Sequence, residues 1–314
     1  MNEPKLTARQ PSEDLKGFTP LLQRIQFAAT AAACHRLPAP FVPVGINMGE
    51  LAWWRRTSES SWRRYPRLFL QGLCTSWAEV FKPGGGEADY LIAILEPWAV
   101  EPLFGLKPEE TVDQLVDLSD ALPGWSARFI AALERAQSSH DKLSALDNAL
   151  VQLLPKKPLV PQSDLRWFMD VSRAHAGAIP VGQIAGDLGR STRYLRAVCK
   201  RSLGVTPKQW SIIERFAANL RRLHPDPWQP KLPVDPDYCD QAHEIHEFKR
   251  MSGVTPSVYR AEKARGDSRL FSTRCLCSQV GQYPGTGEPE RAMSLGIGFD
   301  GAVTRAPTHD PAAG

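Results

Sequence analysis

Val181-Gly-Gln-Ile-Ala-Gly-Asp-Leu-Gly-Arg-Ser-Thr-Arg-Tyr-Leu-Arg196, followed by Gly204-Val-Thr-Pro-Lys208, is the stretch of this chain that decides the fold. A short apolar-periodic run stops at Gly189, a residue that suits the left-handed end of a helix. Ser191 then supplies a side-chain cap for a helix that the periodicity extends to Leu203. A short helix, a glycine turn and a capped helix predict a helix-turn-helix unit, whose second helix fits the major groove of DNA.

The same pattern occurs a second time, starting at Asp237-Tyr-Cys-Asp-Gln-Ala-His243 and continuing through Phe248-Lys-Arg-Met-Ser-Gly-Val-Thr-Pro-Ser-Val-Tyr-Arg260. Each copy ends a predicted helix at a glycine, Gly204 or Gly253, and begins the next with Val-Thr-Pro. A threonine hydroxyl caps free amides, and proline suits the first turn because it has no N–H to leave unpaired. The chain therefore predicts two helix-turn-helix units in one all-helical domain.

The second helix of the first unit separates an apolar face from a basic face. Leu195, Val198 and Ser202 share the face predicted to point inward, helped by Tyr194 and Cys199. The other face carries the residues predicted to contact DNA, which are Thr192, Arg193, Arg196 and Lys200. Between residues 180 and 222 there are nine basic and two acidic residues, a surplus of 9 − 2 = 7. Positive charge gathered on helices is typical of a protein that binds a polyanion.

Between the two units, the spacing of apolar residues predicts one long helix from Pro207 to Leu223. Its roughly 17 residues would make a rod of about 25 Å. A rod of that length would hold two reading helices near the roughly 34 Å repeat of the major groove, so that both read one face of a duplex.

Upstream, the sequence predicts a mixed α/β domain. Strands are expected at Leu68–Leu73, Trp77–Phe81 and Tyr90–Leu95, with a hairpin turn at Gly84-Gly-Gly. Leu21 to Ala33 fits either a helix or a buried strand, and the pattern does not choose between them. After Pro97 the periodicity becomes helical, including the segment that leads through Leu115 and Val116 to Asp120, and continues to Leu154.

The predicted organisation is an α+β chain in five segments. Residues 1–20 are expected to be a flexible arm, 21–155 the mixed α/β domain, 156–162 a linker, 163–264 the all-α domain, and 265–314 a disordered tail. Two lysines and two prolines at Lys156-Lys-Pro-Leu-Val-Pro161 indicate the linker. The tail is rich in Gly, Ser and Pro with little periodicity. The longest apolar runs are too short and interrupted to span a bilayer, and six cysteines without zinc spacing favour a reducing cytoplasm.

From residue 163 to about 264 the chain resembles the DNA-binding domain of the AraC family of bacterial transcription regulators. The resemblance rests on Ile184-Ala185, Leu188-Gly189 and Ser191-x-Arg193-x-Leu195, on both Gly-Val-Thr-Pro closures, on Arg215-Phe216, and on Asp240-Gln-Ala-His243 with Phe248. More diffusely, Leu95–Leu106 and Val116–Asp120 are similar to the N-terminal sensory domains of one subgroup. The resemblance implies an effector-binding or dimerisation module before the DNA-binding domain.

What this resemblance implies for single residues extends to the second unit. Gln241, Ala242 and His246 would face the groove beside Thr192, Arg193 and Arg196, while Ser191 and Asp240 would cap the two recognition helices. Implied partners are double-stranded DNA, a small-molecule effector, RNA polymerase and a second copy of the chain. No cofactor is implied.

The sequence also departs from the family pattern. Ala197 stands where the family usually has a second groove-facing arginine, and Cys199 replaces a core aromatic. Lys231-Leu-Pro-Val-Asp-Pro-Asp237 occupies the place of the helix that supports the second recognition helix, and each interior proline costs a helix about 3 kcal/mol. A degenerate regulator that acts through protein contacts is therefore the alternative function, and the first unit is expected to dominate DNA binding.

Two other readings concern chemistry. Cys239, His243 and His246 lie one turn apart, but three residues are one ligand short of a structural zinc site. Cys34-His35-Arg36 partly matches the Pro-Cys-His-Arg acceptor site of DNA-repair alkyl transferases, without its proline. We expect neither a metal site nor an enzyme.

Overall fold

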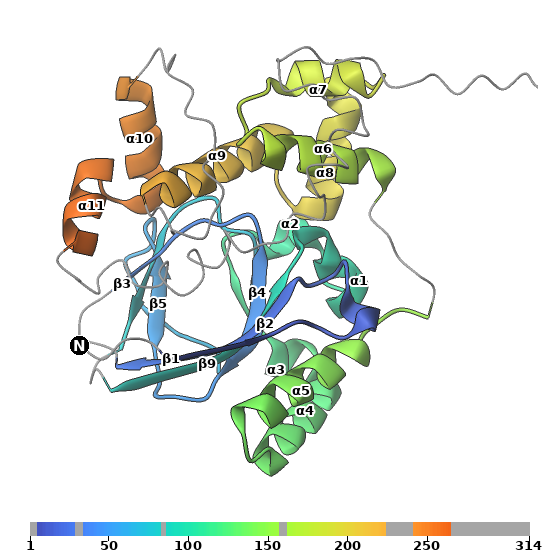
Figure 1. Cartoon of the computed structure of the whole chain (residues 1–314), viewed down its shortest axis with the longest axis vertical. Coiled ribbons are helices and arrows are strands. Elements are labelled where there is room, and N and C mark those ends of the chain that lie inside the picture. The colour runs from blue at the N-terminus through green and yellow to red at the C-terminus, as the bar shows by residue number, and fades with distance from the viewer. Residues whose placement is uncertain (1–4, 29–33, 83–85, 157–161, 224–240, 265–314) are drawn as a thin grey trace, which may run out of the picture.

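The computed structural model describes residues 5–28, 34–82, 86–156, 162–223 and 241–264 (Figure 1). A sheet-rich N-terminal part is followed by helices, which confirms the predicted α+β class. The predicted linker at 156–162 and tail at 265–314 fall almost wholly outside the described residues, as does the segment expected to replace the supporting helix of the second unit. Within the described residues no helix is both long and apolar enough to cross a membrane.

Six antiparallel strands form the larger sheet of the N-terminal part. In spatial order they are β1 (Lys5–Arg9), β2 (Leu21–Ala28), β9 (Glu87–Leu95), β4 (Val42–Asn47), β7 (Leu68–Gln71) and β10 (Leu115–Asp117). The central strands read as nearly continuous apolar runs because they are covered on both faces; β4 is buried along its whole length.

Four further strands form the smaller sheet. Their spatial order is β3 (Cys34–Arg36), β8 (Ala78–Phe81), β5 (Trp53–Arg56) and β6 (Arg63–Arg64). The side chains between the two sheets form a core of their own, which includes Ile25, Phe41, Trp54, Phe69 and Ile92. Among the described residues, β6 and β10 are edge strands of their sheets.

The other face of the larger sheet is covered by short helices and a helical pair. These are the 3-10 turns η1 (Glu13–Leu15) and η2 (Pro97–Ala99), α1 (Val100–Phe104), α2 (Pro108–Thr111), α3 (Leu118–Ala121), α4 (Pro123–Arg135) and α5 (Ser139–Val151). Trp125 of α4 donates its indole N–H to the carbonyl of Ala149 in α5 at 2.7 Å, which fixes the antiparallel pair.

This domain differs from the sequence prediction at three points, and at a fourth it decides between two alternatives that the sequence left open. Residues 5–9, expected in a flexible arm, form strand β1, and all five pair with β2. Leu15, expected in the same arm, is fully buried. Leu21–Ala28, left undecided, is a strand. Leu115–Asp117, read as helical, pairs with β7 as β10. β8 and β9, the strands on either side of the expected hairpin turn, belong to different sheets, and Gly84 itself lies outside the described residues.

Where the sequence predicted helix limits in the C-terminal part, the structure matches them within a residue or two. They are α6 (Ser163–Ala174), α7 (Val181–Asp187), α8 (Thr192–Leu203), α9 (Pro207–Leu223), α10 (Gln241–Ser252) and α11 (Pro256–Ala264). Figure 1 shows α9 running between two groups, with α6 to α8 at one end and α10 and α11 at the other. The long helix is thus a spacer between the two predicted units.

Both groups of helices also touch the N-terminal domain. At Gly204 an added Cβ would lie 2.5 Å from the carbonyl oxygen of Pro108, so α8 ends directly against α2. At the other group, His35 of β3 stacks on Trp77 and donates through Nδ1 to the carbonyl of Ser252 at 2.9 Å. Each end of the helical domain therefore has its own contact with the sheet domain.

Candidate nucleic-acid interface

The first unit is defined by a glycine turn and a helix cap that can be recognised in the sequence. Leu188 ends α7, Gly189 adopts a φ of +63°, and the Ser191 hydroxyl accepts the backbone N–H of Tyr194 at 3.2 Å to cap α8. The inward face of α8 is buried through Leu195, Val198, Cys199 and Leu203. Ser202, expected on this face, is only partly buried, whereas the next residue, Leu203, is buried. This packing leaves the opposite face of α8 in solvent.

Polar contacts hold the turn between α7 and α8 to α6. Arg190 pairs with Asp164 at 2.9 Å, and the hydroxyl of Tyr194 donates to the same carboxylate at 2.9 Å. Asp164 therefore has a lowered pKa, because the hydrogen bonds of Arg190 and Tyr194 outweigh its burial. Arg190, which precedes α8, is engaged in this contact and helps to hold the turn against α6.

The two Gly-Val-Thr-Pro closures take the same conformation. Gly204 and Gly253 have φ values of +79° and +83°, in the left-handed region that glycine tolerates best. After the first, the Thr206 hydroxyl accepts the N–H of Gln209 at 3.2 Å while the Gln209 side chain accepts the N–H of Thr206 at 2.9 Å, which forms a capping box. After the second, Thr255 accepts the N–H of Val258 at 3.4 Å.

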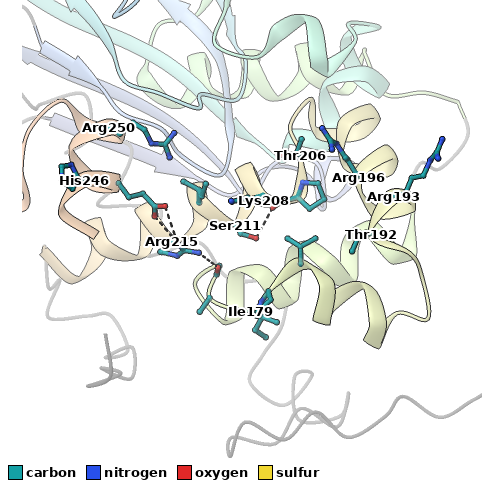
Figure 2. Close-up of a pocket in the computed structure, with 17 residues that line it drawn as sticks. Ile179, Thr192, Arg193, Arg196, Thr206, Lys208, Ser211, Arg215, His246 and Arg250 are labelled. Atoms are coloured by element: carbon teal, nitrogen blue, oxygen red, sulfur yellow. Dashed lines mark hydrogen bonds and ion pairs between the residues drawn. The ribbon is translucent and has the colours of Figure 1, made fainter. Parts of the chain in front are cut away.

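A groove of about 1070 Å³ lies between the two groups of helices. Figure 2 shows that its walls come from α7 and α8 on one side, α9 at the floor and α10 on the other side. Its basic side chains are Arg193, Arg196, Lys208, Arg215, His246 and Arg250, and Glu247 is its acidic residue. A long basic groove between the two groups of helices has the charge that a phosphate backbone requires.

The structure brings some of the predicted contact residues together. Thr192, Arg193 and Arg196 are exposed and line the groove, and the exposed His246 of α10 lines it from the other side (Figure 2). Lys200 is exposed but donates to the carbonyl of Gly204 at 3.2 Å and is not among the groove residues.

The remaining residues predicted for the second unit lie at the edge of what the structure describes. Gln241 and Ala242 begin α10. Asp240, the predicted cap, lies outside the described residues. Cys239 of the alternative metal site does so too, so that site stays a hypothesis.

Three cations of the groove were not predicted as contacts. Lys208 and Arg215 belong to α9, which was read only as a spacer, and Arg250 follows His246 by one helical turn. The spacing of four between His246 and Arg250 was a usable signal, because residues four apart share a helix face.

Arg215 connects both units to the helix between them. Its Nη2 donates to the carbonyl of Gly177 at 2.9 Å, just before α7, and its Nη1 pairs with Glu247 of α10 at 3.4 Å (Figure 2). The guanidinium carries several N–H donors in a fixed plane, so one side chain can serve both contacts. Arg215 is therefore placed to set the angle between α8 and α10.

Cys34, the candidate nucleophile, has the wrong surroundings for that role. Its thiol donates to the carbonyl of Val80 at 3.4 Å, and burial raises its pKa to about 11. A nucleophilic cysteine needs a lowered pKa, because the thiolate is the reactive form. Burial likewise raises the pKa of Cys199 to about 12, as expected for a small apolar core residue.

No protein-family model matches this sequence, and no curated protein matches it. Among solved structures the chain is similar to apo ToxT from Vibrio cholerae, with 10% identity, 81% of this chain and 99% of that chain covered, and a TM-score of 0.43. For unsaturated-fatty-acid-bound ToxT from Vibrio cholerae the identity is 11%, the coverage is 83% of this chain and 97% of that chain, and the TM-score is 0.44. For the AraC-like transcriptional activator CuxR the identity is 15%, the coverage is 70% of this chain and 87% of that chain, and the TM-score is 0.28.

Proposed function

We propose that this chain is a sequence-specific, DNA-binding transcription regulator of the AraC type, which reads the major groove mainly with α8. The observation that carries the proposal is the exposed basic face of α8, with Arg193 and Arg196 one turn apart over a groove shared with the second unit. Arginine pairs bidentately with guanine in the major groove, and the surrounding cations suit phosphates. The second unit adds His246 and Arg250, with Gln241 and Ala242 at the start of its reading helix.

Titration of the full chain against labelled duplex DNA tests the proposal. With about six phosphate contacts, affinity should fall about 10³-fold between about 50 and 200 mM salt. Selection from a randomised duplex pool should then enrich a defined sequence. Binding that is absent at low salt would instead support the alternative of a degenerate regulator that acts through protein contacts.

Within this proposal the N-terminal domain is the sensory module. It contacts the helical domain at two places, through Pro108 and through Trp77 with His35. These contacts offer a physical route by which a change in the sheets would reach both reading helices. A small-molecule effector, RNA polymerase and a second copy of the chain are the partners proposed for it. Retention of RNA polymerase holoenzyme on immobilised chain, and the mass in solution by light scattering, test the last two.

A further inference from the structure

The outward face of the smaller sheet carries aromatic side chains where an antiparallel sheet ordinarily exposes polar ones. Trp54 of β5 is buried between the two sheets, so its neighbour Trp53 points outward, because successive side chains of a strand alternate. Trp53 is 38% exposed, and Leu51, two residues before it, is 53% exposed. Trp54 alone fills the core at this place, so core packing does not account for Trp53.

The strand register shows which side chains share this outward face. Trp53 is paired with Arg64 of β6 on one side and with Phe81 of β8 on the other. Directly paired residues of antiparallel strands lie on the same face, with Cβ atoms about 5 Å apart. The ring of Trp62 packs on Phe81 with 5.7 Å between the ring centroids, and the guanidinium of Arg55 lies 4.6 Å from the centre of the Trp62 ring. The outward face is therefore an aromatic surface with arginines set among the rings.

Positive charge surrounds these aromatic rings. Residues 51–67 contain five arginines, no lysine and one acidic residue, a surplus of 5 − 1 = 4. Three of the arginines pair with the carboxylates of Glu59 and Glu79. Arg64 and Arg67 are exposed, and neither forms an ion pair with another of the described residues. Charge on an edge strand discourages strand pairing between molecules, but that role does not require exposed rings beside the charge.

Part of the outward face is already covered by the end of α10. His35 of β3 lies on this face, because it is paired with Glu79, which is in turn paired with Arg55 of β5. The ring of His35 is hydrogen-bonded to the carbonyl of Ser252 in α10 at 2.9 Å. The open part of the face is therefore limited to β5 and its two neighbours. None of residues 51–67 lines the groove between α8 and α10, so this surface is separate from the candidate duplex interface.

The size of the open part decides what kind of partner fits it. β5 has four residues. Since strands rise about 3.4 Å per residue and lie about 4.8 Å apart, the open part measures about 13 Å by 10 Å. A stable protein–protein interface needs about 800 Å² from each partner, which is several times this area. A single base stacked on an indole ring needs far less.

We propose that the open part of this outward face binds single-stranded nucleic acid, with one base stacked on Trp53 and phosphates held by Arg64 and Arg67. Unpaired bases can lie against an aromatic ring, whereas the bases of a duplex are stacked on each other. Arginines beside the ring then follow the phosphate backbone. Stacking depends little on base identity, so this binding has little sequence preference. The surface goes beyond the proposed reading of duplex DNA by α8 and does not depend on it.

The first test separates stacking from charge. The probe is a fluorescently labelled oligothymidine strand of about 12 nucleotides, and the comparison is an abasic strand with the same number of phosphates. The full chain should bind oligothymidine about fivefold or more tightly than the abasic strand, and Trp53→Ala should remove that preference. Trp167→Ala, which removes a partly buried indole from α6, is the control and should keep it. The melting temperature of each variant establishes that it is folded.

The second test concerns the phosphate contacts. Arg64→Gln should weaken binding of both strands and reduce the slope of log affinity against log salt by about 0.7, the contribution of one phosphate of a single strand. Arg128→Gln, at an exposed position on α4, is the matched control and should change neither quantity.

Several outcomes would overturn the proposal. They are equal affinity of the wild-type chain for oligothymidine and the abasic strand, an unchanged preference in Trp53→Ala, and no binding of either strand at about 50 mM salt. Polyglutamate that competes with oligothymidine as well as unlabelled oligothymidine does would show a site for acidic proteins instead. Arg193→Ala, in the groove, should leave the preference for oligothymidine unchanged. Failure of the proposed duplex reading would therefore be seen separately from failure of this proposal.

Discussion

Arg193 and Arg196 stand on the exposed face of α8 and contribute to the same groove. If they read bases, Arg193→Ala and Arg196→Ala should each weaken binding to the selected sequence by about 1–3 kcal/mol and relax preference at one position. Fluorescence anisotropy with matched and singly altered duplexes measures both effects. Arg201→Ala, on the same helix but outside the groove, is the control and should lower affinity equally for all sequences or not at all. Unchanged base preference in both variants would remove their role as readers.

At the scale of single residues, the sequence separates the faces of α8 but does not show which cations meet in space. Arg193 and Arg196 were predicted from helical spacing alone, and the buried Leu195 and Val198 set that face. Lys200 belongs to the same face of α8 but lies at its last turn, where it contacts the backbone of Gly204. Lys208 and Arg250 enter the groove only because α9 brings two units together, and a periodic pattern within one helix has no information about that distance.

At the scale of elements, α9 is more than a spacer because Arg215 ties it to both units. Arg215→Lys keeps the positive charge but cannot keep both contacts in one geometry. We expect about a tenfold loss of affinity for a duplex carrying both half-sites, equivalent to about 1.4 kcal/mol, and little change for a duplex carrying only the site of α8.

The salt dependence of binding separates this positioning role from a direct phosphate contact. Arg215→Lys should leave the slope of log affinity against log salt unchanged, since no charge is lost. Glu247→Gln provides a second variant, because it weakens the same tie from the α10 side without touching Arg215. Equal losses on one-site and two-site duplexes would show that Arg215 acts as an ordinary contact.

The helices of the C-terminal domain were predictable because their limits are local. Ser191, Thr206, Gly189, Gly204 and Gly253 mark starts and ends within a few residues of the chain, and caps depend on neighbours in sequence. The strands were less predictable, since a strand is defined by its partner. β1 is recognised by its pairing with β2, and β10 by its pairing with β7 across more than forty residues.

At the scale of the whole molecule, a charged cluster joins the two domains. Arg173 of α6 lies 3.5 Å from a carboxylate oxygen of Glu96, at the end of β9, and 3.4 Å from one of Glu214 in α9. Glu214 is fully buried, and burial raises its pKa above the ordinary value against the opposing influence of Arg173 and Arg221. Compared with the unfolded chain, the folded chain therefore favours the protonated form of the Glu214 carboxyl group at the domain interface.

This direction fixes how the stability of the interface depends on pH. A raised carboxyl pKa stabilises the folded chain fully below about pH 4.5, and that stabilisation is lost as the pH rises through the folded pKa. Glu214→Gln removes the titration but keeps the shape, so the melting temperature of the variant should gain on that of the wild type as the pH increases from about 4.5 to 8. Glu134→Gln, at an exposed position on α4, is the matched control for the substitution itself. Scanning fluorimetry across this range measures both, and parallel curves for Glu214→Gln and the wild type would mean that the charge at the interface does not depend on Glu214.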